Sequence, residues 1–305
     1  FFYVADGTFN FYDTEKKTAY QDCYASLNAG KTLGIGNYDS ANIIHSNGKF
    51  YLLVGTSTSN RDHFYIVDAK TLYYENSAVV GANLSGLTIL NEQYGLVTGD
   101  GIRRIDLKSL NNVRIKNERL LCFYNSIIYN GKVLSNDTYK DESKVKYYDV
   151  NELIAAKEGE APAVTELDII QKQKINFVLA KDGNVYTLES ADNGCNIVKI
   201  KNDFTLEKVF ANFQPAKGPY HSSPTIGMVA SETENIIYLV STDGAIYKYI
   251  LGDSDSLKAP FIAAESGVSI TAPLQLNQQS GELYVTYTEE RKDESKIVVY
   301  SKDGK

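Results

Sequence analysis

The most constraining feature of the chain is an internal repeat. The pentapeptide KDESK occurs at 140–144 and again at 292–296, and each copy leads directly into a strand-like segment, VKYYDV or IVVYSK. A looser unit also recurs, in which an apolar strand ends in Asp or another polar residue, a short turn follows, and a further strand begins. Copies of this unit start at residues 10, 64, 102, 145, 197, 246 and 297, so they are spaced by about 40 to 55 residues. A spacing in this range is typical of the blades of a β-propeller.

Turn residues divide each unit into strands. Asn-Gly or Asp-Gly separates two apolar runs within 41–55, 126–136 and 176–190, and these dipeptides tolerate the positive φ angles of tight hairpin turns. Counted in this way, the chain has six first strands and seven second and third strands. The sequence therefore predicts an all-β, seven-bladed β-propeller of four-stranded antiparallel blades, formed as a single domain by 1–305. Helical periodicity is confined to 151–161, where we expect one or two helical turns inserted after a third strand.

Composition restricts the possible partners. The formal net charge is −7 and the basic residues are scattered, which disfavours nucleic-acid binding because that binding depends on clustered Lys and Arg. The 3 cysteines, Cys23, Cys122 and Cys195, show no CxxC spacing, so we expect free thiols instead of disulfides or a zinc site. No run of 18 apolar residues is present, so we expect no transmembrane span. We expect a monomer.

Catalytic and metal-binding motifs are not found in the sequence. GxSxG, HExxH and GxxxxGK[ST] are missing, and Trp, which repeated quinoprotein or sialidase motifs contain or accompany, is absent. The 3 histidines, His45, His63 and His221, fall in three different blades. The acidic segment 252–256 has carboxylates spaced for a cation, but it lacks the Gly and the distal Glu of an EF-hand loop. We therefore predict no catalytic residues, no metal and no cofactor, and we interpret this segment as a polar turn.

The candidate ligand site lies on one face of the predicted propeller. Connections from a fourth strand to the next first strand share this face with the turns between second and third strands. They comprise 34–42, 80–86, 123–126, 174–177, 214–224 and 266–272, with 58–64 and 136–142 at the rim. Tyr rings and directional polar groups in these loops suit small-molecule capture. The predicted ligand-binding residues are Asn37, Tyr38, Arg61, His63, Asn83, Tyr124, Asn125, Tyr139, Asn176, Tyr220, His221 and Ser222.

Two segments resemble a known family. LQLNQQSGELYVTYTEERKDESKIVVYSKDGK at 274–305 and the segment 10–72 look like YncE-like propellers, in particular the surface lipoproteins of gut Bacteroidetes. There, a phrase of the form T/S-G-E-hydrophobic-Y-V precedes a loop and V-Y-S-K-D-G-K. The resemblance covers nearly the whole chain, but its motifs form blades and specify no chemistry. It implies an exported propeller, lipid-anchored on the outer-membrane surface or periplasmic, with an export segment upstream. One member type captures cobalamin for a TonB-dependent transporter.

Three functional hypotheses remain open. The first is non-enzymatic capture of a nutrient, a corrinoid or a glycan, for a TonB-dependent transporter. The second is a protein-interaction scaffold that uses the same face, since Tyr-rich loops suit both roles. The third is an enzyme of lyase or lactonase type that uses Tyr and His as acid and base. Among the loops, GPYHSSP at 218–224 is the strongest candidate, because two prolines and a glycine stiffen a loop that carries Tyr220 and His221. A deep pocket lined by these two residues would favour a small ligand, and a flat face would favour a protein.

Overall fold

The computed structural model describes most of the chain and divides it into two compact units. The described residues are 2–5, 8–13, 16–20, 38–56, 62–71, 74–81, 86–99, 101–116, 126–136, 143–160, 162–171, 177–216, 227–270, 274–289 and 295–305. Unit 1 comprises Phe1–Phe123 and Asn151–Pro162, and unit 2 comprises Tyr124–Val150 and Ala163–Lys305. Each unit is described by itself below.

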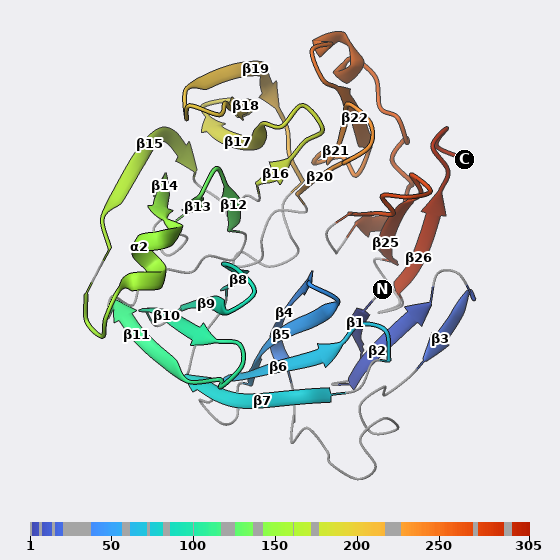
Figure 1. Cartoon of the computed structure of the whole chain (residues 1–305). Helices are drawn as coiled ribbons and strands as arrows, with labels where there is room; N and C mark the ends of the chain where they lie inside the picture. Colours follow the sequence, from blue (N-terminus) through green and yellow to red (C-terminus); the bar gives the residue numbers. More distant parts are fainter. Residues whose placement is uncertain are drawn as a thin grey trace. The chain divides into compact units, whose positions relative to one another are not determined.

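Unit 1 contains three antiparallel sheets (Figure 1). The first consists of β1 (Phe2–Ala5), β2 (Thr8–Asp13) and β3 (Thr18–Tyr20). The second consists of β4 (Tyr38–Ser46), β5 (Lys49–Thr56), β6 (Asp62–Asp68) and β7 (Tyr74–Gly81). The third consists of β8 (Gly86–Ile89), β9 (Tyr94–Gly99), β10 (Gly101–Asp106) and β11 (Asn112–Lys116).

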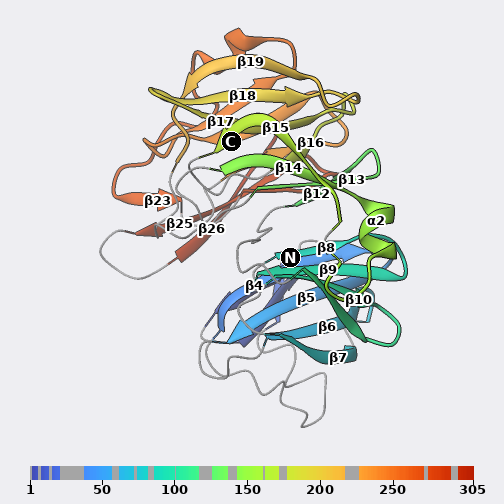
Figure 2. The same ribbon diagram turned by 90° about the vertical axis from the view of Figure 1, so that its left-hand side faces the viewer.

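The described residues of unit 2 form four antiparallel sheets, and Figure 2 shows the strands β19, β18 and β17 of one of them one above another. The first consists of β12 (Ile127–Tyr129), β13 (Lys132–Asn136), β14 (Ser143–Asp149) and β15 (Val164–Gln171). The second consists of β16 (Val178–Leu179), β17 (Val185–Ala191), β18 (Gly194–Ile200) and β19 (Leu206–Phe213). The third is β20 (Met228–Ala230), β21 (Ile236–Val240) and β22 (Ile246–Ile250), with the 3-10 helix η1 (Ser254–Leu257) after it. The fourth is β23 (Val268–Ile270), β24 (Gln275–Leu276), β25 (Leu283–Glu289) and β26 (Ser295–Tyr300).

Within each unit, the first strands of consecutive sheets are neighbours. Strand β4 contacts β8 in unit 1, and β12, β16, β20 and β24 contact one another in succession in unit 2. Apolar side chains fill the space between neighbouring sheets. Between the sheets β12–β15 and β16–β19, for example, the buried cluster includes Leu134, Ile169, Val185 and Val198. Burial of this kind supplies the main driving force for stacking one blade on the next.

The predicted propeller pattern of four-stranded antiparallel blades is confirmed, but the predicted count of seven blades is wrong: the described residues form six blades that include a first strand. In the described residues, six sheets include a first strand, whereas the sheet β1–β3 begins on what the sequence identifies as a second strand. In the last sheet, β23 and β24 both pair with β25, so they are two parts of one interrupted first strand. The segment 266–272, predicted to be a connecting loop, therefore contains a strand, because its residues Val268–Ile270 continue the pairing along β25.

Asp68 and Asp106, which end the third strands β6 and β10, form the turns that follow them. The Asp68 carboxylate accepts hydrogen bonds from the backbone N–H groups of Lys70 and Thr71, at 3.0 and 2.7 Å. Asp106 accepts the same two bonds from Lys108 and Ser109. The backbone and hydroxyl hydrogen bonds from Thr71 lower the pKa of Asp68. These Asp residues are therefore explained by turn structure, since their side chains satisfy backbone donors that no strand partner can reach.

The predicted helical insertion is confirmed as α2 (Val150–Ala155). Its residue Leu153 is fully buried in unit 1. The Arg104 guanidinium, on β10, donates hydrogen bonds to the carbonyl oxygens of Leu153, Ile154 and Ala156 at the end of the helix, the last at 3.0 Å. A cation at this position satisfies terminal carbonyls and complements the helix dipole. Arg104 therefore fixes the insertion against the sheet β8–β11.

Candidate ligand-binding face

Most of the predicted site residues lie outside the described residues. Only Tyr38 and His63 lie inside them, and both belong to unit 1. Each was predicted to lie in a loop, and each instead lies in a strand. Tyr38 starts β4, where a bulge between Tyr38 and Ser40 allows the pairing with β5 to continue. His63 is the second residue of β6 and is half-buried, with its ring stacked on Tyr65 at 5.9 Å between ring centroids. The other predicted residues are Asn37, Arg61, Asn83, Tyr124, Asn125, Tyr139, Asn176, Tyr220, His221 and Ser222.

The described residues that flank these loops form a polar cluster in unit 2. Asn136 is the last residue of β13, Gln171 is the last residue of β15, and Thr187 lies on β17 of the next sheet. The side-chain amide of Asn136 donates to Gln171 Oε1 at 2.6 Å. Gln171 Nε2 donates to Thr187 Oγ1 and to the carbonyl oxygen of Leu188, both at 3.0 Å. We call Asn136, Gln171 and Thr187 the amide clip; it joins two neighbouring sheets at the ends of their strands.

A second set of contacts holds the start of the loop 214–224. Gln214 Nε2 donates to the Asn193 carbonyl oxygen in the β17–β18 turn, at 2.6 Å. Pro215 forms a bridge with Ser241, and the backbone N–H of Ala216 donates to the Val240 carbonyl oxygen at 2.9 Å. The end of a fourth strand thus meets the turns between second and third strands of its own sheet and of the next. The predicted ligand-binding face requires these two kinds of connection to lie together, and within unit 2 they do at this position.

Glycine is required where this set of contacts is closest. Gly194 begins β18 with a φ of +116°, a backbone conformation that residues with a side chain rarely adopt. A Cβ atom there would lie 2.5 Å from the Phe213 carbonyl oxygen and would also collide with the Gln214 amide. The β17–β18 turn can therefore approach the end of β19 closely only because residue 194 has no side chain.

The charged groups at this end are engaged in local contacts. Glu189 on β17 accepts a hydrogen bond from Asn196 at 2.8 Å and lies 3.6 Å from the Lys208 ammonium. Hydrogen bonds from the Ser241 hydroxyl and the Ala245 amide lower the pKa of Asp243. Burial raises the pKa of the Cys195 thiol to about 11, and the charge of Glu189 adds to the shift. Cys195 is free, as predicted, and its environment does not activate it; Cys23 and Cys122 lie outside the described residues.

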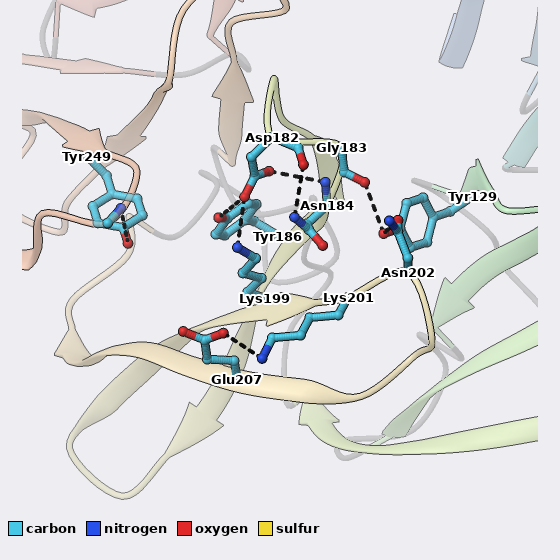
Figure 3. Close-up of polar contacts among 11 residues, drawn as sticks. Tyr129, Asp182, Gly183, Asn184, Tyr186, Lys199, Lys201, Asn202, Glu207 and Tyr249 are labelled. Atoms are coloured by element: carbon cyan, nitrogen blue, oxygen red, sulfur yellow. Dashed lines mark hydrogen bonds and ion pairs between the residues drawn. The ribbon is translucent and has the colours of Figure 1, made fainter.

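A polar cluster occupies the opposite end of the same sheets (Figure 3). Asp182, in the β16–β17 turn, accepts hydrogen bonds from the Tyr186 hydroxyl at 2.8 Å and the Asn184 backbone N–H at 3.1 Å, and pairs with Lys199 at 2.9 Å. Burial opposes ionisation of Asp182, but these donors outweigh it, so the pKa of its carboxyl is lowered. Burial, together with the bond to Asp182, holds the pKa of Tyr186 far above its usual value. We call Asp182, Tyr186 and Lys199 the turn cluster.

The turn cluster has the composition of a catalytic group but not its chemistry. Tyr186 is almost completely buried, and its hydroxyl is held protonated by the carboxylate that accepts its hydrogen bond. In the neighbouring sheet, Tyr129 donates to Asn202 Oδ1 at 2.6 Å and contacts the Gly183 carbonyl oxygen at 3.0 Å, which ties two sheets together (Figure 3). A general base needs an accessible lone pair and a pKa near the working pH. The turn cluster does not meet these requirements. Its contacts instead stabilise the turn between β16 and β17.

Metal ligands do not converge in the part of the chain that the structure describes, where no group of three His, Cys, Asp or Glu side chains could hold an ion. In the acidic segment 252–256, the Asp253 carboxylate caps η1 by accepting a hydrogen bond from the Asp255 N–H at 3.0 Å. None of the described helices is long and apolar enough to cross a membrane.

Comparison with known proteins places the chain in a family. One family, described as a domain of unknown function and called DUF5074, matches residues 1–304. The chain belongs to the DUF5074 family. No curated protein matches the sequence. The predicted likeness to YncE-like surface lipoproteins is therefore confirmed only as far as the propeller fold.

Solved structures share the fold of this DUF5074 chain. Hsv2 of Kluyveromyces lactis with its complete loop 6CD gives a TM-score of 0.53 at 9% identity, covering 98% of this chain and 94% of that chain. A structure from a study of two prolyl endopeptidases gives 0.51 at 10% identity, covering 87% of this chain and 41% of that chain. A streptogramin B lyase structure gives 0.48 at 15% identity, covering 88% of this chain and 85% of that chain, a score too low to carry an argument. The first two similarities support an all-β propeller with four-stranded antiparallel blades and say nothing about activity.

Proposed function

We propose that this DUF5074 protein is a non-enzymatic ligand-binding propeller whose site lies where the connections from fourth to first strands meet the turns between second and third strands. The ligand is a nutrient, a corrinoid or a glycan, which the protein passes to a TonB-dependent outer-membrane transporter. The proposal includes a monomeric single domain over 1–305, exported to the outer-membrane surface or the periplasm. The family match from residue 1 to residue 304 supports the single domain.

The observation that carries the proposal is the contrast between the two ends of the sheets in unit 2. At the turn-cluster end, the polar groups of Asp182, Tyr186 and Lys199 bind one another within a hairpin. At the opposite end, buried Asn136 and Gln171 lie directly before the segments 137–142 and 172–176, which carry Tyr139 and Asn176. Polar side chains buried at the base of such connections favour a site that presents directional groups in a fixed arrangement.

Five buried tyrosines give the enzymatic alternative no support. Burial is the first cause of a raised pKa in Tyr51, Tyr129, Tyr186, Tyr238 and Tyr287, so each hydroxyl is harder to deprotonate than in water. A lyase or lactonase would need a hydroxyl or imidazole poised near the working pH. The scaffold alternative predicts no binding of small molecules, and the experiment below separates it from capture.

The proposal is tested with purified protein and defined probes. Cyanocobalamin and oligosaccharides of starch, xylan and mannan are titrated into the protein in a calorimeter, and a variant with Tyr220→Ala and His221→Ala is compared with the wild type. We expect one probe to bind the wild type, with binding lost in this variant and the melting temperature unchanged. A control variant carries His45→Ala and Lys181→Ala, which are exposed residues at the turns between first and second strands, and should bind normally.

Two outcomes would overturn the proposal. If no probe binds the wild type, small-molecule capture of these classes is rejected and the scaffold hypothesis gains support. If a probe binds equally well to the variant with Tyr220→Ala and His221→Ala, the site lies elsewhere.

A further inference from the structure

We infer that Gln171 is a positioning residue, which fixes the ends of β13 and β15, the residues directly before the segments 137–142 and 172–176, against strand β17 of the next sheet. The inference deepens the proposed function and rests on it only for the ligand measurement. The geometric claim, that one amide holds the last paired residues of β13 and β15 against β17, stands on the described residues alone.

The hydrogen bonds of the amide clip determine its orientation without ambiguity. The Leu188 carbonyl oxygen can only accept a hydrogen bond, so Gln171 must direct its Nε2 toward it. Gln171 Oε1 then faces Asn136, whose Nδ2 must be the donor. Both hydrogens of the Gln171 amide are used, since Thr187 Oγ1 accepts the second. The orientation of each side chain thus follows from that of its neighbour.

The clip is located at the last paired residues of two strands. Asn136 pairs with Val145 at the end of β13, and Gln171 pairs with Ser143 at the end of β15. Asn136, Gln171 and Thr187 are 2%, 1% and 0% exposed, so water does not compete for their hydrogen bonds. Both connections therefore leave the sheet from positions that a buried side-chain contact holds in place.

Stability alone does not explain a polar clip at this position. The space below it is filled by Leu134, Val145 and Ile169, and an apolar residue in place of Gln171 would extend that cluster. Buried hydrogen bonds contribute little net stability, because each replaces a bond to water, but an unmatched partner costs free energy. The clip therefore adds little to the free energy of unfolding. Its main effect is to favour one arrangement of the strand ends over arrangements that leave its polar groups unmatched.

The chain supplies a matched control at the opposite end of the sheets. Gln278 also joins two sheets through its amide: its Nε2 donates to the Ala230 carbonyl oxygen at 3.0 Å, and its Oε1 accepts from the Glu232 N–H at 2.8 Å. Gln278 lies in the turn between first and second strands, on the end where we place no ligand. Gln171→Met and Gln278→Met are therefore the same chemical change at the two ends.

The test measures hydrogen exchange by mass spectrometry, the melting temperature, and the affinity for cyanocobalamin and the three oligosaccharides. For Gln171→Met we expect exchange to rise by about five- to tenfold in peptides covering 132–136 and 164–171, the two strands that end at the clip, which is the size expected for loss of a buried hydrogen bond. For Gln278→Met, whose side chain is only half-buried so that water replaces part of the lost bonds, we expect a smaller fall in melting temperature and unchanged exchange in both peptides. If Gln171→Met fails to fold, Thr187→Val removes one acceptor of the clip and should raise exchange in the same peptides by a smaller factor.

The outcomes separate this inference from the proposed function. Unchanged exchange in both peptides of Gln171→Met, or an equal rise in Gln278→Met, would overturn the inference. A local rise without binding of any probe would support the positioning role and reject the proposed function. If a probe binds, its affinity should fall in Gln171→Met and not in Gln278→Met, and an equal fall in both variants would reject the link between the clip and the ligand.

Discussion

The turn cluster provides a quantitative test of how hairpin turns are stabilised in this fold. Tyr186→Phe removes one hydrogen bond to the Asp182 carboxylate and leaves the ring, which lies edge-on to Tyr249 at 6.4 Å between centroids. A hydrogen bond to a charged group contributes about 1.5 to 3 kcal/mol. Asp182 retains Lys199, and its side chain is 23% exposed, so water replaces part of the lost bond and the lower limit applies. We expect a loss of about 1.5 kcal/mol, seen as a fall in melting temperature of roughly 2 °C for a 305-residue chain.

The pH dependence of the same variants tests the assignment of charges. The pKa of Asp182 is lowered in the folded state, so its contribution is present above the unfolded value of about 3.9 and is lost as pH falls through the folded value. The stability difference between the wild type and Asp182→Asn should therefore shrink below about pH 4. The pKa of Tyr186 is raised, so its contribution is lost only as pH rises above the unfolded value of about 10.

Urea denaturation followed by circular dichroism gives the free energies for a double-mutant cycle of Tyr186→Phe and Asp182→Asn. We expect a coupling energy of about 1 kcal/mol, since the two groups share a hydrogen bond. Additive effects at pH 7, or a Tyr186→Phe protein as stable as the wild type, would refute the reasoning.

Three further predictions concern single positions. Gly194→Ala should destabilise the protein by about 2 to 3 kcal/mol, because residue 194 has a positive φ and a Cβ atom there would collide with Phe213. Gly48→Ala, at a residue with φ +69° and open space around it, should destabilise the protein by only about 1 kcal/mol. Equal melting temperatures of the two variants would contradict this prediction. Arg104→Met should release the end of α2 and speed trypsin cleavage after exposed Lys157, without changing cleavage after Lys181; an unchanged digestion pattern would show that Arg104 does not hold the helix. In a Cys23→Ser and Cys122→Ser background, Cys195 should react with a disulfide reagent at pH 7 no faster than the protein unfolds, because burial raises its pKa; rapid reaction of the folded protein would reject this.

Local signals in the sequence predicted the strands and turns well. Third strands β14 and β26 begin at the Ser of the two KDESK copies, and the Asn47-Gly48 turn has positive φ at both residues. These features depend on neighbouring residues, so a single sequence contains them. The interruption of the first strand between β23 and β24 was missed, because pairing along β25 decides it.

Contacts between distant segments could not be predicted in the same way. Asn136 and Gln171 resemble ordinary polar residues at strand ends, and only the stacking of two sheets brings them together with Thr187. Arg104 is separated by about fifty residues from the helix carbonyls that it binds, and no motif joins them. Tyr38 and His63 fall within the loops 34–42 and 58–64 that propeller geometry predicts, but strand pairing extends into both segments. The other predicted site residues stay predictions.

Hydrogen exchange with and without a bound probe tests the central claim most directly. The protein is compared free and saturated with cyanocobalamin or with the oligosaccharide that binds in calorimetry. The account predicts slower exchange in peptides covering 137–142, 172–176 and 217–226, with no change at three turns of unit 2, Asn130–Gly131, Lys181–Asn184 and Asn277–Gly281. Protection confined to those three turns would place the ligand at the opposite end of the sheets and contradict the account.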